Sequence, residues 1–333
     1  MQTPAVQLIG VSKRVGRKTI VDRLSFDIRP GEVFGFLGPN GAGKTTTIRM
    51  MVGLIAMSEG DVLFGGISVK DDFRAAIAQV GAIVENPEMY KSLTGYQNLR
   101  QYARMAGDVT KARIDEVVRQ VDLAGRIHDK VRTYSLGMRQ RLGLAQALLH
   151  KPKALILDEP TNGLDPAGIR DIRLLLRRLA AEDGIAVVVS SHLLAEMELM
   201  CDRFAIIQEG RLKAIHATRG GDGDGDETAS GAGRQLPQGT ALLLRVEPLE
   251  AAQACLAAEF PAIAVRELEG GELRVEAGHD KAPAIVSALA GRELRIFKVQ
   301  PVAKSLEDTF IELTEEGGDR DAHRFASVRQ AVR

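Results

Sequence analysis

The 333-residue sequence predicts an α/β fold built on a mostly parallel sheet, followed by a smaller α+β domain. Short apolar segments alternate with helical segments over the first two thirds of the chain, and such continuous apolar runs are typical of strands buried on both faces. A glycine-rich loop at residues 38–46 joins one of these strands to a helix. Beyond residue 239 the order becomes β-α-β-β-α-β, which indicates a small two-layer domain of the split β-α-β kind.

Periodicity places the elements of the larger domain. The expected strands are residues 6–11, 20–28, 33–37, 61–66, 80–84, 154–157 and 185–189. A polar turn at residues 13–18 separates the first two strands. The expected helices are residues 46–51, 166–181 and a helical stretch from 94 to 149. In that stretch Thr94 and Gln97 have the spacing of a capping box. One apolar helical face is formed by Ile114, Val117, Val118 and Val121.

A change of composition divides the chain. The Gly- and Asp-rich run from Gly220 to Gly233 has almost no apolar content, so we expect a flexible linker. Its Gly-Asp alternation also resembles a calcium loop, but the closing bidentate Glu is missing. The elements expected after it are strands 241–246, 263–268, 272–276 and 293–299, and helices 249–259, 281–290 and 305–315. The predicted parts are a first domain 1–217 with a helical subdomain at about 86–150, the linker 218–239, an accessory domain 240–316 and a polar tail 317–333.

Composition narrows the class of protein. The 44 basic and 44 acidic residues balance, so we expect no nucleic acid as a partner. No run approaches 18 uncharged apolar residues, and the N-terminus lacks the features of a signal peptide. Cys201 and Cys255 are far apart and have no metal-ligand spacing. These features predict a reduced protein of the cytosol, with both cysteines in ordinary core or surface positions.

The glycine-rich loop carries the clearest functional pattern, because it fits Gly-x-x-x-x-Gly-Lys-[Ser/Thr] between a strand and a helix. Its glycines let successive backbone N–H groups point at phosphate oxygens beside the positive end of the helix. Lys44 is expected to reach the β- and γ-phosphates, and the Thr45 hydroxyl to bind Mg²⁺. The predicted nucleotide-binding residues of the loop are Gly38, Pro39, Asn40, Gly41, Ala42, Gly43, Lys44, Thr45 and Thr46. The sequence therefore predicts binding of a nucleoside triphosphate.

Two carboxylates supply a second signal. Asp158 and Glu159 follow the apolar run 154–157, at the carboxyl end of a buried strand, where open α/β sheets bind their ligands. We expect Asp158 to hold Mg²⁺ and Glu159 to polarise the attacking water.

Together these motifs resemble the nucleotide-binding subunit of ATP-binding-cassette transporters over roughly residues 5–217. The run Thr161 to Pro166 is similar to the D-loop of that family, with Asp165 as its aspartate. The segment from Ser190 to His192 is similar to its switch-histidine segment, and the run Tyr134 to Arg141 takes the place of its signature motif. The resemblance implies a P-loop NTPase cassette, in which a mostly parallel sheet is joined by antiparallel β and helical subdomains.

The resemblance also implies a mechanism and partners. In the family, two cassettes sandwich two ATP molecules head to tail, as a homodimer or a heterodimer. Ser135 and the backbone N–H of Gly137 are then expected to bind the γ-phosphate held by the other subunit, beside Asp165 of the D-loop. His192 is expected to contact the γ-phosphate and hold the water and Glu159 in register. Because the chain has no membrane span, a separate permease is implied, with this subunit cytoplasmic and peripheral on the inner face of the cell membrane.

Three departures from the family pattern are informative. The signature has Tyr134, Leu136 and Met138 at its first, third and fifth places, and the Q-loop position has Glu85 as a candidate magnesium ligand. Both changes resemble the bacitracin-resistance, lantibiotic-immunity and multidrug export branch. Val15 stands where the family places an aromatic ring against adenine, so either the base packs on this aliphatic side chain or another residue covers it.

The predicted function is that of an ATPase subunit powering an exporter of peptides, drugs or lipids, with ATP and Mg²⁺ as ligands. One alternative is a soluble ATPase of the same type that acts on ribosomes or nucleic acid, and another is a nucleotide-gated binding module without catalysis. Tyr90 and Tyr96 in the helical subdomain fit either a permease interface or local core packing. For the accessory domain, dimer stabilisation or regulation is expected, and ligand sensing is the alternative.

Overall fold

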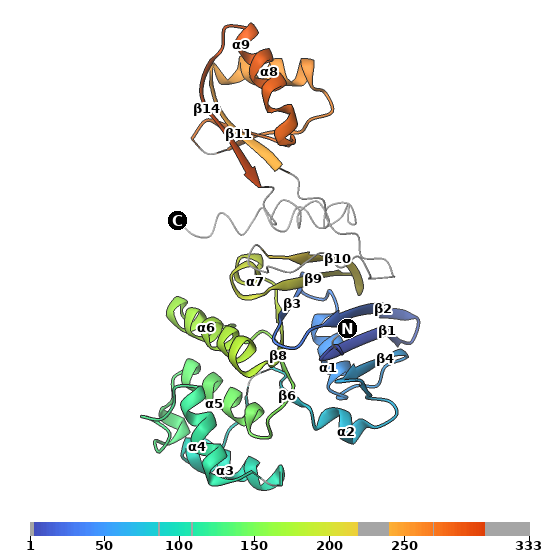
Figure 1. The fold of residues 1–333 in the computed structure, drawn as a ribbon, viewed down its shortest axis with the longest axis vertical. Helices are drawn as coiled ribbons and strands as arrows, with labels where there is room; N and C mark the ends of the chain where they lie inside the picture. The colour runs from blue at the N-terminus through green and yellow to red at the C-terminus, as the bar shows by residue number, and fades with distance from the viewer. Residues whose placement is uncertain (1–2, 86, 108, 219–239, 269, 304–333) are drawn as a thin grey trace. The chain divides into compact units, whose positions relative to one another are not determined.

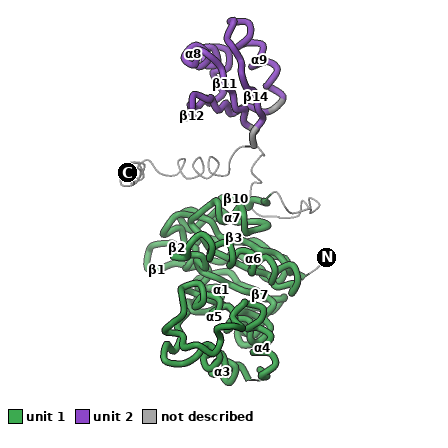
Figure 2. Tube along the Cα trace, turned by 90° about the vertical axis from the view of Figure 1, so that its left-hand side faces the viewer, with its two compact units in different colours: residues 1–235 green, residues 236–333 purple. Residues whose placement is uncertain are grey.

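The computed structural model describes residues 3–85, 87–107, 109–218, 240–268 and 270–303. The chain forms two compact units, residues 1–235 and 236–333, coloured separately in Figure 2. The predicted linker beyond Thr218, the helix expected at 305–315 and the polar tail 317–333 lie outside the described residues.

A six-stranded sheet forms the centre of the first unit, in the order β10-β9-β3-β8-β7-β6 (Figure 1). Its strands are β3 (Val33–Leu37), β6 (Val80–Ile83), β7 (Ala154–Leu157), β8 (Ala186–Ser191), β9 (Arg203–Gln208) and β10 (Arg211–Ala217). All neighbouring pairs are parallel except β9 and β10. Strands β3, β7 and β8 are buried along their whole length, as their continuous apolar sequences predict.

A second, antiparallel sheet in the order β2-β1-β4-β5 contributes to the same core. It contains β1 (Val6–Val15), β2 (Lys18–Ile28), β4 (Glu59–Phe64) and β5 (Ile67–Ser68). Phe26 of β2 stacks on Phe34 of β3 with ring centroids 5.3 Å apart, so the two sheets share one apolar layer. Helices α1 (Lys44–Met51) and α2 (Phe73–Ile77) also contribute buried residues to this layer.

Helices complete the first unit, and Figure 1 shows α3, α4 and α5 gathered together away from α1. These are α3 (Gly95–Met105), α4 (Lys111–Gln120) and α5 (Leu136–Leu148), with a short 3-10 helix at Val131–Thr133. The capping box of Thr94 and Gln97 is confirmed, and so is the buried face of α4. Helices α6 (Pro166–Asp183) and α7 (Leu194–Met200) pack against the central sheet.

Several expected boundaries differ from those of the structure, and two of the differences concern the first hairpin and the phosphate-binding loop. The polar turn predicted at residues 13–18 is only a two-residue turn, because Val15 pairs with Lys18 and both belong to strands. Gly16, with a φ of +58°, allows this tight reversal. The helix expected to begin at Thr46 begins at Lys44, directly after the left-handed Gly43.

The second unit has the predicted β-α-β-β-α-β order. Its antiparallel sheet runs β12-β13-β11-β14, so β13 lies between the two strands that flank the first helix, as in a split β-α-β arrangement. The elements are β11 (Thr240–Glu247), α8 (Leu249–Glu259), β12 (Val265–Leu268), β13 (Glu272–Val275), α9 (Ala282–Gly291) and β14 (Arg295–Ala303), with a 3-10 turn at His279–Lys281. Its own core joins the inward residues of β11 and β13 to α8 and α9.

Both cysteines occupy core positions, Cys201 in the first unit and Cys255 in the second. In the part of the chain that the structure describes, no helix combines the length and apolar character needed to cross a membrane.

Gly35 is predicted to be essential for packing of the central sheet. A Cβ on Gly35 would lie 2.6 Å from the sulfur of Met197 and 2.9 Å from that of Cys201. We expect Gly35→Ala to lower the free energy of unfolding of this unit by about 1–3 kcal/mol, because the buried strand has no room to shift. The chain has four tyrosines and no tryptophan, and all the tyrosines belong to residues 1–235, so tyrosine fluorescence in urea follows this unit alone.

Gly125→Ala is the matched control, since a Cβ there meets no atom within 4 Å. Equal urea midpoints for the two variants would contradict the packing argument.

Candidate nucleotide-binding site

The glycine-rich loop connects β3 to α1 at the carboxyl edge of the central sheet. Gly41 and Gly43 have φ values of +81° and +104°, which a residue with a side chain adopts only with strain. This backbone leads directly into the first turn of α1 at Lys44 and Thr45, where backbone N–H groups have no partner within the helix. The predicted phosphate-binding loop therefore has the strand-loop-helix context that an anion requires.

Lys44 is buried within this loop, with only 6% of its surface exposed. Its Nζ donates hydrogen bonds to the carbonyl oxygens of Gly38 at 2.7 Å and Pro39 at 3.3 Å, and lies 4.0 Å from Oε1 of Glu159. Burial lowers the pKa of the Lys44 ammonium, and the carboxylates of Glu159 and Asp158 partly oppose that shift. A lysine held at the mouth of the loop is well placed to exchange these carbonyls for phosphate oxygens.

Asp158 and Glu159 follow β7 and are connected to β8 by one hydroxyl. The Ser190 Oγ donates a 2.5 Å hydrogen bond to Oδ1 of Asp158 and accepts a 2.9 Å hydrogen bond from the backbone N–H of Glu159. Ser190 is fully buried, so neither bond competes with solvent. Glu159 has a φ of +48°, in the left-handed region that non-glycine residues rarely adopt, and strain of this kind concentrates at functional sites.

His192 lies next to Glu159, as the sequence predicts. Its Nδ1 is 2.9 Å and 3.2 Å from the two carboxylate oxygens of Glu159. The carboxylate therefore favours the tautomer with a proton on Nδ1, which leaves Nε2 as an acceptor. The structure thus brings Lys44, Asp158, Glu159 and His192 together at one edge of the sheet.

The donors fit a magnesium ion. Thr45 supplies a hydroxyl and Asp158 a carboxylate, both hard oxygen ligands, and Mg²⁺ is usually held by one or two carboxylates together with phosphate oxygens. Among the described residues, no three His, Cys, Asp or Glu side chains gather closely enough to hold a metal by themselves. The carboxylate of the third predicted ligand, Glu85, forms an ion pair with Arg49 of α1, and its role as a magnesium ligand stays a prediction.

Three other predicted residues lie at the starts of α5 and α6. Ser135 caps α5 by accepting a hydrogen bond from the N–H of Met138 at 3.2 Å, and Asp165 caps α6 by accepting one from Gly168 at 3.1 Å. A Cβ on Gly137 would be 3.9 Å from a methyl group of Leu164, so these two helix starts lie close together. Within the described residues, no hydrogen bond or ion pair connects Ser135, Gly137 or Asp165 to the phosphate-binding loop.

The aromatic and base-stacking positions differ in their surroundings. Val15 ends β1 at the hairpin and is 60% exposed, so its side chain is free to contact a ligand. Tyr134 is buried and its hydroxyl donates to the carbonyl of Arg126, which makes it a core residue. Tyr90 is 63% exposed, whereas the ring of Tyr96 packs against His128.

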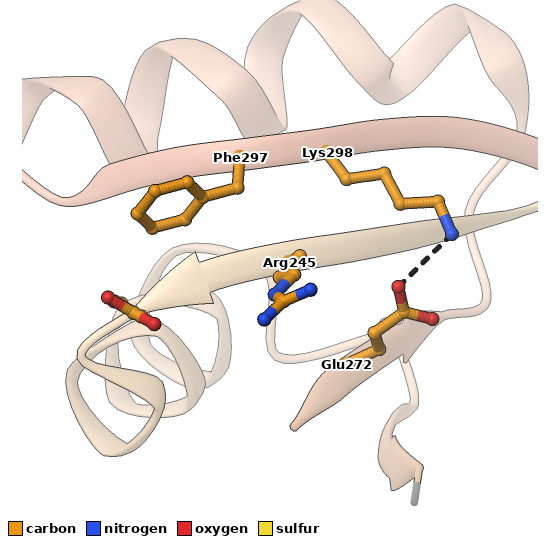
Figure 3. Close-up of a pocket in the computed structure, with 5 residues that line it drawn as sticks. Arg245, Glu272, Phe297 and Lys298 are labelled. Atoms are coloured by element: carbon orange, nitrogen blue, oxygen red, sulfur yellow. Dashed lines mark hydrogen bonds and ion pairs between the residues drawn. The ribbon is translucent and has the colours of Figure 1, made fainter. Parts of the chain in front are cut away.

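The second unit carries a feature that its sequence did not indicate. An open pocket lies on its sheet face, lined by Arg245, Glu247, Glu272, Phe297 and Lys298 (Figure 3). Lys298 pairs with Glu272 at 3.1 Å, and Phe297 is 58% exposed. This mixed-charge face is separate from the nucleotide-binding residues, all of which belong to the first unit.

Sequence reasoning missed two residues with direct contacts in the site. Ser190 was recognised only as part of the histidine segment, and a polar residue at the end of a buried strand is the signal that could have identified its role. Arg49, the partner of Glu85, has no comparable signal because arginine is ordinary on an exposed helix face.

Comparisons with known proteins agree with this geometry. Residues 21–162 match the family model described as ABC transporter. The uncharacterized ABC transporter ATP-binding protein YhcH of Bacillus subtilis (strain 168) is 52% identical over 318 residues, covering 96% of this chain and 98% of that protein. The bacitracin transport ATP-binding protein BcrA of Bacillus licheniformis is 44% identical over 207 residues, 62% of this chain and 68% of that protein. A dimeric, post-hydrolysis ATP-binding cassette bound to ADP and Pi has a TM-score of 0.57 and 25% identity, covering 65% of this chain and 99% of that chain.

Removing the Ser190 hydroxyl is expected to slow nucleotide hydrolysis. Ser190→Ala leaves Oδ1 of Asp158 and the N–H of Glu159 without their shared partner. Since a hydrogen bond to a charged group contributes roughly 1.5–3 kcal/mol, we expect kcat to fall by about tenfold or more. Ser191→Ala is the control, because that hydroxyl accepts from the backbone of Leu193 instead. Equal kcat values for Ser190→Ala and the wild-type protein would exclude the bridging role.

An aromatic ring at position 15 is expected to tighten adenine nucleotides more than guanine nucleotides. Val15→Tyr adds a stacking face, worth roughly 1–3 kcal/mol per base, at an exposed position. Dissociation constants of ATP and GTP measure the change, and Val15→Leu controls for apolar volume. Unchanged dissociation constants for both nucleotides would mean that Val15 does not contact the base.

Proposed function

The chain belongs to the ABC transporter family as an ATP-binding protein, and from this we propose that it hydrolyses ATP to power export through a separate membrane permease. One observation carries the proposal: Lys44, Asp158, Glu159 and His192 meet at the carboxyl edge of the central sheet. A phosphate-binding cation, a magnesium ligand and a carboxylate–histidine pair are the groups that phosphoryl transfer to water requires.

Each group has a distinct task in the proposed reaction. The loop N–H groups and Lys44 bind the β- and γ-phosphates, and Thr45 and Asp158 hold magnesium, which when bound neutralises charge on the transferring phosphoryl group. Glu159 accepts a hydrogen bond from the attacking water, which raises the electron density on the water oxygen and makes it a better nucleophile. The Nδ1 contact of His192 fixes the Glu159 carboxylate, and its Nε2 is free to reach the γ-phosphate region.

Two copies are proposed to complete the site. Ser135, Gly137 and Asp165 lie at adjacent helix starts, and within the described part of the chain they form no hydrogen bond or ion pair with the phosphate-binding loop. A second cassette facing the first would bring these helix starts to the loop, where their positive ends favour the γ-phosphate. The similar dimeric cassette bound to ADP and Pi supports this arrangement, with either an identical or a related cassette as partner.

The cargo is proposed by class only: peptides, drugs or lipids. The bacitracin transport relative supports an exported peptide antibiotic, but its similarity covers 62% of this chain. The subunit is proposed to work on the cytoplasmic side of the cell membrane, peripheral to the permease. A soluble ATPase acting on ribosomes or nucleic acid gains no support from the relatives. The accessory domain at 240–316 is proposed to stabilise or regulate the dimer.

Glu159→Gln is expected to separate binding from hydrolysis. The amide keeps the size of the side chain but loses the negative charge, so kcat should fall by about 10²-fold or more while ATP still binds. With ATP and Mg²⁺ the variant should accumulate as a dimer, measured by light scattering after gel filtration. Rapid residual hydrolysis would remove Glu159 from the role of water-polarising residue.

The same variant also tests the transporter assignment. Purified with ATP from detergent-solubilised membranes of its own host, it should retain a stoichiometric protein with several membrane spans, identified by mass spectrometry. Ribosomal proteins or DNA-bound factors in place of a membrane protein would contradict the proposed function. Asp183→Asn, on an exposed helix end outside the site, is the control for nonspecific co-purification.

A further inference from the structure

Arg49 and Glu85 form an ion pair between two segments that border the nucleotide site. Arg49 belongs to α1, the helix that begins in the phosphate-binding loop, and Glu85 follows the end of β6. Glu85 has a φ of +71°, so the backbone adopts an unfavourable conformation where the carboxylate meets the guanidinium. Both side chains are partly exposed, which means that surrounding atoms do not force the contact.

The position of Arg49 on α1 relates the pair to the magnesium ligands. Arg49 is four residues after Thr45, so the two share one side of the helix about one turn, roughly 5.4 Å, apart. The ion pair therefore keeps the Glu85 carboxylate on the side of α1 that carries Thr45.

The negative charges around the site give the Arg49–Glu85 ion pair an effect on nucleotide binding. A triphosphate bound to the loop would face Asp158 and Glu159, and a free carboxylate at Glu85 would add a third negative charge. Lys44 is already shared among the loop carbonyls and Glu159. Arg49 is the cation that balances Glu85.

We propose that Arg49 is a positioning residue that neutralises Glu85 and fixes where its carboxylate lies relative to the bound triphosphate. The effects of the two residues depend on each other, so a carboxylate at position 85 leaves ATP binding intact only while Arg49 is present. The inference rests on the proposed function, because it concerns the same nucleotide site.

The test is a double-mutant cycle on nucleotide binding. Dissociation constants of a fluorescent ATP analogue are measured for wild type, Arg49→Gln, Glu85→Gln and the double variant, in EDTA and in Mg²⁺. We expect Arg49→Gln to weaken binding by roughly threefold to tenfold in EDTA, where repulsion by the unpaired carboxylate is unscreened by metal, and by less in Mg²⁺. Glu85→Gln in the Arg49→Gln background should restore binding to the level of Glu85→Gln alone.

Two further variants separate positioning from simpler causes. Arg49→Lys keeps the charge and should bind as the wild type does. Arg295→Gln removes an exposed arginine paired with Glu247 in the second unit, so it makes the same change of charge in the unit that holds no predicted nucleotide-binding residue. In ATPase assays Arg49→Gln should raise KM with little change in kcat. Tyrosine fluorescence during urea unfolding confirms that the Arg49 and Glu85 variants are folded, and circular dichroism checks the folding of Arg295→Gln.

The possible outcomes distinguish a failure of the Arg49–Glu85 inference from a failure of the proposed function. Equal weakening by Arg49→Gln in the presence and absence of Glu85 would mean that Arg49 acts on the nucleotide or the fold directly, which overturns the inference. Equal weakening by Arg295→Gln would also overturn it, because net charge would then be the cause. If Arg49→Gln does not fold, Arg49→Ala replaces it in the same cycle, because alanine is the best helix former. Weakening of ATP binding by Arg49→Ala that persists in the Glu85→Gln background contradicts the inference, and its suppression there supports it. Failure of the wild-type protein to bind ATP would instead refute the proposed function.

Discussion

The site depends on the register of three buried parallel strands. Leu37 at the end of β3 pairs with Ser191 of β8, and Leu157 at the end of β7 pairs with Val189 of the same strand. The loop, the two carboxylates and the histidine therefore start from one edge of the sheet at matched heights. A slip of one residue would turn every side chain of a strand to the opposite face, so the packing of both faces fixes the chemistry at the edge.

At this edge of the sheet, the hydrogen bonds of Ser190 are buried, so water does not compete for them. The buried Ser190 hydroxyl connects β8 to the end of β7. It donates a hydrogen bond to Asp158 and accepts one from the backbone N–H of Glu159. The hydrogen bond from the backbone N–H of Glu159 to Ser190 helps to stabilise the left-handed backbone conformation of Glu159. The carboxylate therefore points toward His192 before any substrate arrives, and its reorganisation during the reaction is small.

Local patterns predicted much of this, whereas contacts between distant residues were not predictable. The apolar strands, the glycine loop and the cap at Thr94 depend on neighbouring residues, and the structure confirms them. The hairpin at Gly16 was predicted too long, because polar residues such as Lys13 and Lys18 occur equally in turns and in exposed strands. Arg49 and Glu85 are 36 positions apart in the sequence, and no periodic pattern predicts a contact between residues so far apart. The roles assigned to Ser135, Gly137, Asp165 and Val15 stay predictions, since each concerns a ligand or a second chain.

Lys44 is bound by the backbone of its own loop. Its ammonium is already hydrogen-bonded to the carbonyls of Gly38 and Pro39, so an incoming nucleotide exchanges hydrogen bonds and adds few new ones. What changes is the charge on the acceptor, from a neutral carbonyl dipole to an anionic oxygen. In the proposed reaction, Lys44 would therefore favour a phosphate tail with more negative charges. Once the γ-phosphate has left, Lys44 would return to the carbonyls of Gly38 and Pro39, which would favour release of the diphosphate product.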